Sequence, residues 1–147
     1  MVNAAQSAGE EFDMTDRPTR TSTADQTERA AIEAVIKTYL DGLYEGNADK
    51  LAEAFHPTSS LAQTLEGQLK VTPRDAWLEI VRNRPSPQSQ KLARGDEILT
   101  IDVAGPTLAF VKLRCAIPPR YFTDQLSLLK IDGRWQIAQK VFQTEMR

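Results

Sequence analysis

Apolar residues recur every three or four positions in the first half of the chain and every second position in the second half. The helical spacing is clearest over residues 24–46, where one helix face would hold Ile32, Val35, Ile36, Tyr39, Leu40 and Leu43. Most charged residues of this segment fall on the opposite face. Gly46 and Asn47 follow, and both are typical of a helix end. The pattern therefore predicts a long amphipathic helix over residues 24–46.

A short second helix is predicted over residues 48–55. Asn47 precedes it, and asparagine is a favoured capping residue. His56 ends it, because the residue before a proline disfavours helical backbone. Leu51 and Phe55 lie on its apolar side.

A small hairpin and a third helix are predicted after this. Residues 59–71 read as two short strands around Glu66 and Gly67. Thr72 can then cap a helix that has Pro73 at its first helical position and runs to about Arg84.

The period changes to two from Asp96 onward, which predicts a series of strands. They are expected at residues 97–103, 107–116, 121–131 and 134–143. Asp132 and Gly133 predict a two-residue hairpin turn between the last two strands. Three helices with a small hairpin, followed by a four-stranded meander, predict an α+β fold with helices on one face of a mostly antiparallel sheet.

The last hairpin can be read in register. With Asp132 and Gly133 in the turn, residue numbers of facing pairs sum to a constant. The pairs of this register are Leu128 with Ile137, Leu126 with Gln139, and Asp124 with Val141. It gives a core face with two polar members, made of Phe122, Asp124, Leu126, Leu128, Trp135, Ile137, Gln139 and Val141. We prefer it because it groups the apolar residues, although a one-residue bulge would set Asp124 opposite Lys140.

Residues 1–23 are predicted to form a flexible tail before a single domain at residues 24–147. The tail holds one aromatic residue, Phe12, and has no periodic apolar pattern. Two alternatives remain open: a strap across a partner subunit, or sequence upstream of a start at Met14. A secretory signal pattern is lacking, so a cytoplasmic location is expected.

Composition excludes several classes of protein. The 147 residues include 18 Lys and Arg against 20 Asp and Glu, a balance that argues against a nucleic-acid binder. The single Cys115 cannot form an intramolecular disulfide, and the single His56 cannot form a multi-histidine metal site. Motifs for nucleotide phosphates or catalytic zinc are lacking, so neither a metal nor a cofactor is expected. No apolar run is long enough to span a membrane.

Several short motifs resemble a known bacterial family. They are Tyr39-Leu40-x-Gly42, Leu51-x-x-x-Phe55-His56-Pro57, Thr123-Asp124-x-Leu126-x-Leu128-Leu129-Lys130-Ile131-Asp132-Gly133-x-Trp135-x-Ile137, and Lys140-Val141-Phe142. Over residues 26–143 the chain resembles the NTF2-like superfamily and, within it, the lumazine-binding-like family related to SnoaL-like proteins. The resemblance implies a cone in which a curved sheet wraps around helices, a pocket between the two, and homodimers joined through the sheets. Ketosteroid isomerase and scytalone dehydratase belong to nearby groups, but their catalytic residues do not map by motif onto this chain.

Two ionisable residues are candidates for acid–base catalysis. Asp124 lies on an apolar strand face, where a carboxylate needs a partner or a raised pKa. Its structural alternative is a carboxylate bonded to a backbone turn or to Lys112, Arg114 or Lys140. His56 has the only side chain that ordinarily titrates near neutrality, and its alternative is a histidine at a helix end that is bonded to a carbonyl or simply exposed.

The candidate ligand-binding residues are aromatic, basic or amide side chains on predicted helices and strands. They are Tyr39, Trp77, Phe110, Phe122, Lys112, Arg114 and Gln139. Core packing is the alternative for the aromatic residues, and a solvated outer face for the two basic ones.

Three functions are therefore carried forward. The first is binding of a small, largely apolar molecule in a pocket. The second is a cofactor-free isomerase or dehydratase that uses Asp124 or His56 as acid or base. The third is a dimeric interaction module, for which we expect burial of a sheet face made of Gln125, Ser127, Gln136, Ala138 and Phe142.

Overall fold

The helices and strands of the computed structural model, which describes residues 23–147, follow the predicted order. The three helices of this range are α2 (Thr23–Glu45), α3 (Ala48–Ala54) and α4 (Arg74–Arg82). Its six strands are β2 (Phe55–Leu65), β3 (Gln68–Pro73), β4 (Glu97–Val103), β5 (Leu108–Ile117), β6 (Arg120–Ile131) and β7 (Arg134–Met146). The predicted α+β class is confirmed. The tail prediction falls almost entirely on residues outside the described range.

The beginnings of α3 and α4 show how local chemistry sets the helix boundaries. The Asn47 side-chain oxygen accepts hydrogen bonds from the backbone N–H groups of Asp49 and Lys50, both at 3.1 Å, as the capping prediction requires. The predicted Thr72 cap of α4 is wrong, because the N-cap is Pro73 and no side chain caps this helix. Thr72 instead continues β3 and pairs with Leu61 of β2.

The six strands form one sheet with the order β3-β2-β7-β6-β5-β4. The predicted meander is confirmed, since β4, β5, β6 and β7 pair successively and antiparallel. Asp132 and Gly133 both have positive φ angles, 52° and 76°, as the predicted two-residue turn requires. The pairing of β2 with β7 is parallel, and the sequence pattern did not predict it.

A bulge in β7 changes the predicted register of the last hairpin. Leu128 faces Ile137 as predicted, but Ser127 then faces Gln139, so that Ala138 is the extra residue. The predicted pairings of Leu126 with Gln139 and of Asp124 with Val141 are therefore wrong. Leu126 faces Lys140 and Asp124 faces Phe142. The alternative bulge considered from the sequence, which sets Asp124 opposite Lys140, would need the extra residue in β6. The observed extra residue lies in β7.

The bulge also exchanges the faces on which the residues of β7 lie. Lys140 and Phe142 pair with inward-facing residues of β6, whereas Gln139 and Val141 pair with the outward-facing Ser127 and Gln125. Val141 is 49% exposed, and Lys140 is only 4% exposed. The predicted inward placement of Val141 and Gln139 is therefore corrected, because one extra residue inverts the alternation of a strand.

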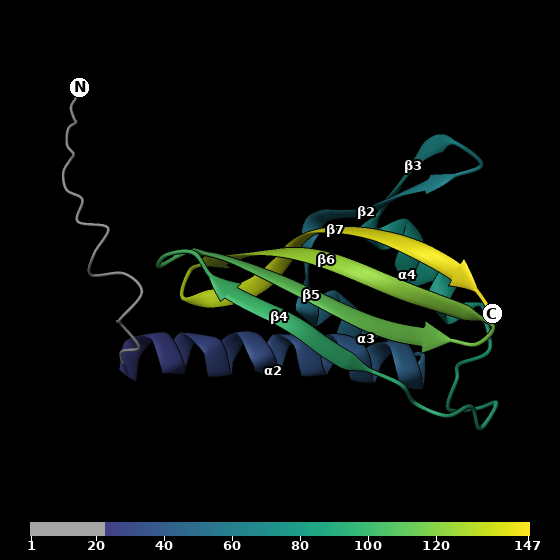
Figure 1. Ribbon diagram of the computed structural model, residues 1–147, viewed down its shortest axis with the longest axis horizontal. Coiled ribbons are helices and arrows are strands. Elements are labelled where there is room, and N and C mark those ends of the chain that lie inside the picture. The colour runs from purple at the N-terminus through teal and green to yellow at the C-terminus, as the bar shows by residue number, and fades with distance from the viewer. Residues whose placement is uncertain (1–22) are drawn as a thin grey trace.

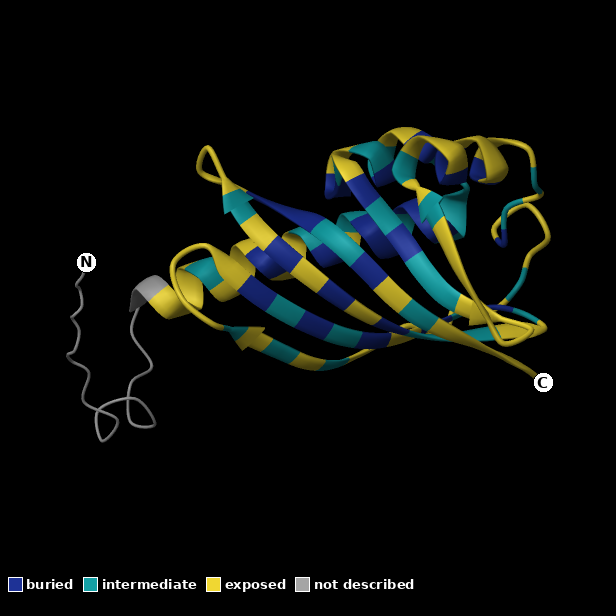
Figure 2. Ribbon diagram, turned by 90° about the horizontal axis from the view of Figure 1, so that it is seen from above, coloured by how far each residue is buried: buried dark blue, intermediate teal, exposed yellow. Residues whose placement is uncertain are grey.

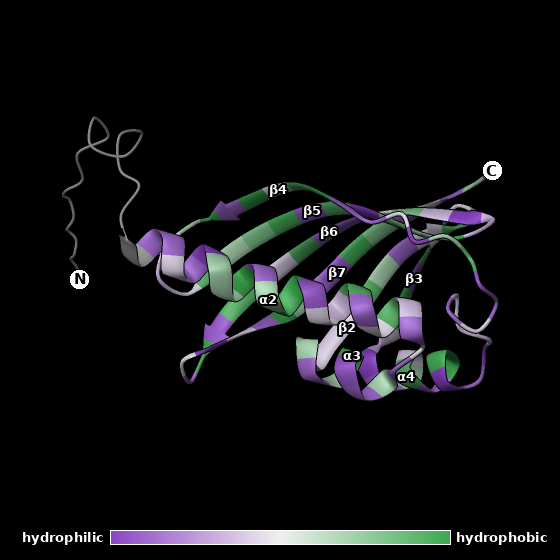
Figure 3. Ribbon diagram, turned by 90° about the horizontal axis from the view of Figure 1, so that it is seen from below, coloured by the Kyte–Doolittle hydropathy of each residue, from purple (hydrophilic) through white to green (hydrophobic). Residues whose placement is uncertain are grey.

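The core lies between the helices and one face of the sheet (Figures 1 and 3). Its centre contains a group of packed aromatic rings. The Phe55 ring lies 5.2 Å from that of Tyr39 and 5.0 Å from that of Trp77, in edge-to-face geometry. The long helix α2 contributes fully buried Ile32 and Ile36 to the same core. This packing places the fully buried Tyr39 ring against those of Phe55 and Trp77.

The opposite face of the sheet is not covered by helices, and exposed and buried residues alternate along its strands (Figure 2). Leu108 of β5 faces Leu129 of β6 at one end of this face, and the two are 46% and 39% exposed. We call this surface the outer face. Among the helices of the described range, none is both long and apolar enough to cross a membrane.

Candidate functional site

A cavity of about 670 Å³ lies between the β2–β3 hairpin, helix α4 and the ends of β5, β6 and β7. Its walls are partly apolar, with side chains that include Leu43, Leu61, Trp77, Ile117, Phe122 and Phe142. Its polar lining includes Lys70, Arg84, Arg120 and Lys140. The size matches that of cavities that hold small organic molecules.

Lys140 is the buried ionisable residue of this cavity. Its ammonium lies 4.6 Å from the centre of the Phe142 ring and 5.2 Å from those of Tyr39 and Trp77. The Phe122 ring is 6.0 Å away. Four aromatic rings therefore surround one cation, and the attraction of a cation to ring faces is strengthened where water is excluded.

The Lys140 ammonium also belongs to a hydrogen-bonded chain that leads away from the cavity. Its Nζ donates a hydrogen bond of 2.8 Å to the Tyr39 hydroxyl, which in turn donates to Oδ2 of Asp124. Nζ and Oδ2 are themselves 3.7 Å apart. Asp124 is fully buried, and its pairing with Lys140 explains how a carboxylate is tolerated there.

One atom of this chain has no partner. Within the described residues, Oδ1 of Asp124 is the buried side-chain oxygen or nitrogen that makes no hydrogen bond. Asp124 and Tyr39 do not line the cavity, whereas Lys140 does. A ligand would therefore touch Lys140, with Tyr39 and Asp124 behind it.

Burial keeps two neighbouring groups neutral. The pKa of Tyr39 is raised well above its ordinary value by burial and then by the charge of Asp124. Burial likewise raises the pKa of the Cys115 thiol, and Asp124 adds to the effect. Its sulfur lies 3.9 Å from Oδ2 of Asp124. Tyr39 therefore stays a hydrogen-bond donor, and Cys115 stays a thiol rather than a nucleophilic thiolate.

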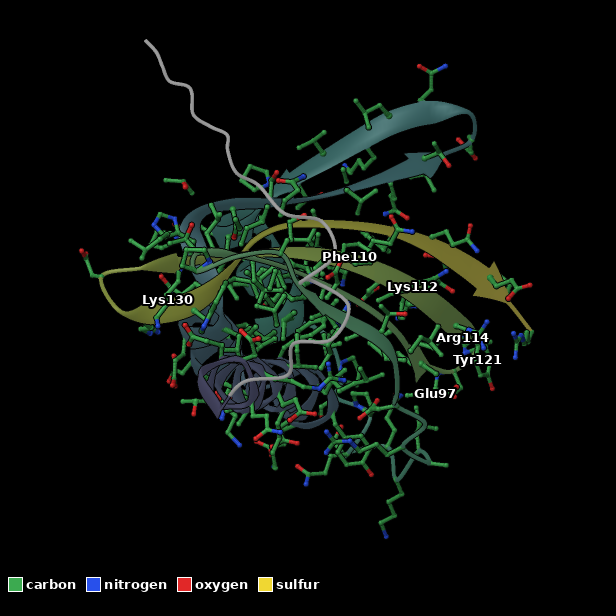
Figure 4. All side chains as sticks on the ribbon, turned by 60° about the vertical axis from the view of Figure 1, so that its left-hand side comes forward. Glu97, Phe110, Lys112, Arg114, Tyr121 and Lys130 are labelled. Carbon is green, nitrogen blue, oxygen red and sulfur yellow. The ribbon has the colours of Figure 1, made fainter. Side chains whose placement is uncertain are left out.

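The predicted ligand-binding residues divide between the two faces of the sheet. Trp77 and Phe122 line the cavity, and Tyr39 supports Lys140 from behind. Phe110, Lys112 and Arg114 follow one another along β5 (Figure 4). They do not line this cavity, because they alternate with the inward-facing Ala109, Val111, Leu113 and Cys115 and so point to the outer face. Gln139 lies on the outer face too, and accepts a hydrogen bond of 2.9 Å from the Ser60 hydroxyl.

His56 and Asp124, the two candidate catalytic residues, are not brought together. His56 is the second residue of β2, and its Nδ1 accepts a hydrogen bond of 3.2 Å from the backbone N–H of Thr58. It does not line the cavity.

Lys140 and Arg84 are cavity residues that the sequence pattern did not indicate as site residues. Lys140 was named only as a possible partner of Asp124, because the preferred register placed it outside. The available signal was a lysine directly before the apolar Val141 and Phe142 on the predicted last strand. No local pattern indicated that Arg84 and Arg120 line one cavity, since 35 residues separate them along the chain. Within the described residues, no three His, Cys, Asp or Glu side chains form a group that could hold a metal ion.

Comparison with solved structures defines the class of fold. An NTF2-like protein of unknown function from Shewanella baltica OS155 superposes with a TM-score of 0.75 and 23% identity, over 87% of this chain and 100% of that chain. One from Silicibacter pomeroyi DSS-3 gives a TM-score of 0.73 and 23% identity, over 85% of this chain and 100% of that chain. The architecture is that of NTF2-like proteins, as the sequence motifs implied.

The family follows from the sequence match. The chain belongs to the family described as "Putative lumazine-binding", whose model matches residues 27–143. A curated relative, aldolase FrzH from Cladobotryum sp., is 27% identical over 123 residues, which cover 82% of this chain and 94% of that protein.

Proposed function

We propose that this protein binds a small, largely apolar molecule in the cavity, with the Lys140 ammonium donating a hydrogen bond to an oxygen atom of the ligand. The observation that carries the proposal is the position of Lys140, buried among four aromatic rings and yet part of the cavity lining. An ammonium has three N–H donors, and Tyr39 accepts from one of them. Donors therefore remain for a ligand.

The walls of the cavity favour a flat, unsaturated ligand. Trp77 and Phe122 line it on different elements, and the Lys140 chain supplies a polar end. A planar ring system with carbonyl oxygens combines the two requirements. Lumazine, the molecule in the description of the family, is such a ring system, and it is the first probe to use.

A binding experiment tests this proposal directly. Lumazine fluorescence is titrated with the full chain and with Lys140→Met, which keeps the length of the side chain and removes the charge. Lys130→Met is the matched control, because Lys130 pairs with Glu28 at 2.8 Å and does not line the cavity. We expect Lys140→Met to weaken binding about tenfold or more, the usual effect of losing a charge-assisted hydrogen bond. If lumazine does not bind and native mass spectrometry detects no co-purified small molecule, the proposal is wrong.

A second candidate function is enzymatic, and the relative named an aldolase favours it. An aldol reaction passes through an enolate, whose negative oxygen a buried ammonium can stabilise without a cofactor. Lys140 would face that oxygen, and Tyr39 with Asp124 would hold the ammonium in place. Asp124 then acts as a positioning residue, and His56 has no part in the reaction. In this reaction a solvent base removes an α-proton of a ketone, Lys140 stabilises the enolate oxygen, and the enolate carbon takes up a deuteron from deuterated water. Loss of this exchange in Lys140→Met and its retention in Lys130→Met is the expected signature.

We also propose a homodimer joined through the outer face. Leu108, Leu129 and Val141 expose apolar surface there, and helices do not cover them. Of the five predicted surface residues, Gln125 and Ser127 are exposed, whereas Phe142 lines the cavity and Gln136 is buried, with its side chain donating to the backbone oxygen of Glu53. A second copy of the same face would cover the exposed apolar residues.

A further inference from the structure

Two arginines from distant parts of the chain line the same cavity as Lys140. Arg84 follows the end of helix α4, and Arg120 is the first residue of β6. Arg84 is half-buried. Burial lowers the pKa of its guanidinium, and the positive charge of Arg120 lowers it further. The two cations therefore line one cavity with like charges.

Carboxylates do not compensate these two charges. Among the ion pairs of residues 23–147, none includes Arg84 or Arg120. Nearby arginines contrast with them. Arg82 pairs with Glu79 at 2.6 Å, and Arg147 holds Glu145 at 3.0 Å at the same end of the sheet.

The remaining lining residues make the cavity cationic. Lys70 and Lys140 add two positive charges, and Glu66, in the β2–β3 turn, is the acidic residue of the lining. Asp124 neutralises Lys140 from behind, but it does not reach the two arginines. A half-buried guanidinium beside another cation is electrostatically unfavourable, and an anion between them would remove this repulsion. Guanidinium groups bind carboxylate and phosphate with paired hydrogen bonds.

We infer that the ligand is an amphiphilic anion, whose carboxylate or phosphate group binds Arg84 and Arg120 while its apolar body lies against Trp77 and Phe122. This inference rests on the proposed function, since it specifies the ligand of the same cavity. The Lys140 ammonium then donates a hydrogen bond to a second oxygen atom of the same ligand. The cavity would thus bind the ligand through two polar contacts, one with the arginines and one with Lys140, and through apolar contact with the aromatic rings.

Two dyes that differ by one anionic group separate this inference from the proposed function. 1-Anilinonaphthalene-8-sulfonate carries a sulfonate, and N-phenyl-1-naphthylamine is the same ring system without it. Both are titrated by fluorescence against the full chain. We expect the sulfonate dye to bind at least about tenfold more tightly, the effect of one charge-assisted interaction.

Single substitutions of the two arginines test whether their side chains bind the anionic group. Arg84→Gln and Arg120→Gln are each expected to weaken the sulfonate dye about tenfold and to change the neutral dye less than about twofold. Arg82→Gln is the control, because Arg82 lies two residues before Arg84 and pairs with Glu79 outside the cavity. Arg120 is exposed, so its replacement tests the inference even if Arg84→Gln does not fold.

Competition then distinguishes the two kinds of anion. 1-Naphthoate and 1-naphthyl phosphate are each added to the complex with the sulfonate dye, and the stronger competitor identifies the anion. Displacement by neither of them, or equal binding of both dyes in all variants, overturns the inference and leaves the proposed function standing. Failure of both dyes to bind contradicts the proposed function as well.

Discussion

The ammonium of Lys140 lies 3.7 Å from the carboxylate of Asp124, although the two residues do not face each other across the strands. Tyr39 of helix α2 bridges them, because its hydroxyl accepts from one and donates to the other. A charge pair in a fully buried position depends on both members, since either one alone would be an uncompensated charge.

Removing one member of this pair should destabilise the protein more than removing both. We expect Lys140→Met and Asp124→Asn each to lower the free energy of unfolding by about 3–5 kcal/mol, because each leaves a buried charge without its partner. The double variant should lose less than the sum of the two. Urea denaturation of the four proteins measures this coupling. Additive losses would mean that the two charges do not interact.

Stability should fall in alkaline solution because of Cys115. Folding raises the pKa of its thiol above the ordinary value of 9.0, so above pH 9 the unfolded chain loses a proton that the folded chain keeps. The unfolded state then binds fewer protons, and the free energy of unfolding decreases as pH rises. Between pH 8 and pH 10 the loss from Cys115 alone is about 1.4 kcal/mol. The raised pKa of Tyr39 adds a further decrease in the same direction above pH 10.

Urea denaturation at these two pH values checks the alkaline effect. Cys115→Ala should reduce the decrease by about the amount given above, while any packing loss affects both pH values equally. A decrease of the same size in Cys115→Ala would show that other groups are responsible. Rapid reaction of the native thiol with a disulfide reagent at pH 8 would equally contradict its burial.

Gly46 should tolerate no side chain, for two separable reasons. Its φ angle is +66°, which disfavours residues with a Cβ atom, and a Cβ there would lie 2.7 Å from Cβ of Ser86. Gly67 has a φ angle of +78° and open space around it. We expect Gly67→Ala to lose about 1 kcal/mol from backbone strain and Gly46→Ala about 1–3 kcal/mol more from overlap. Thermal unfolding compares the two variants, and equal losses would mean that the loop at Ser86 moves aside.

The outer face should join two copies of the chain. Light scattering at micromolar concentration is expected to give a dimer, and Ser127→Arg to give a monomer, because Ser127 lies on the exposed side of the central strand β6. Ala30→Arg on the exposed side of α2 is the control and should stay dimeric. A monomeric parent protein would refute this interface.

The amino-acid sequence by itself determined the elements and the class of fold. Helix and strand periods, the Asn47 cap and the turn at Asp132 and Gly133 are properties of neighbouring residues, so they can be recognised without tertiary contacts. The motifs also indicated the family. The site depended on strand register and on contacts between residues that are distant in the chain. A single bulge residue, Ala138, inverted the faces of Lys140 and Val141, and alternation alone cannot reveal such an insertion.

Only the tertiary structure decided which ionisable groups meet. Asp124 was singled out because a carboxylate on an apolar strand face needs a partner, a requirement that the sequence does reveal. That the partner is Lys140, bridged by Tyr39, depends on how helix α2 packs against the sheet. That Arg84 and Arg120 line one cavity depends in the same way on the parallel pairing of β2 with β7, which brings the hairpin and α4 beside the ends of the meander. Such contacts join residues far apart in the chain, and no local pattern encodes them.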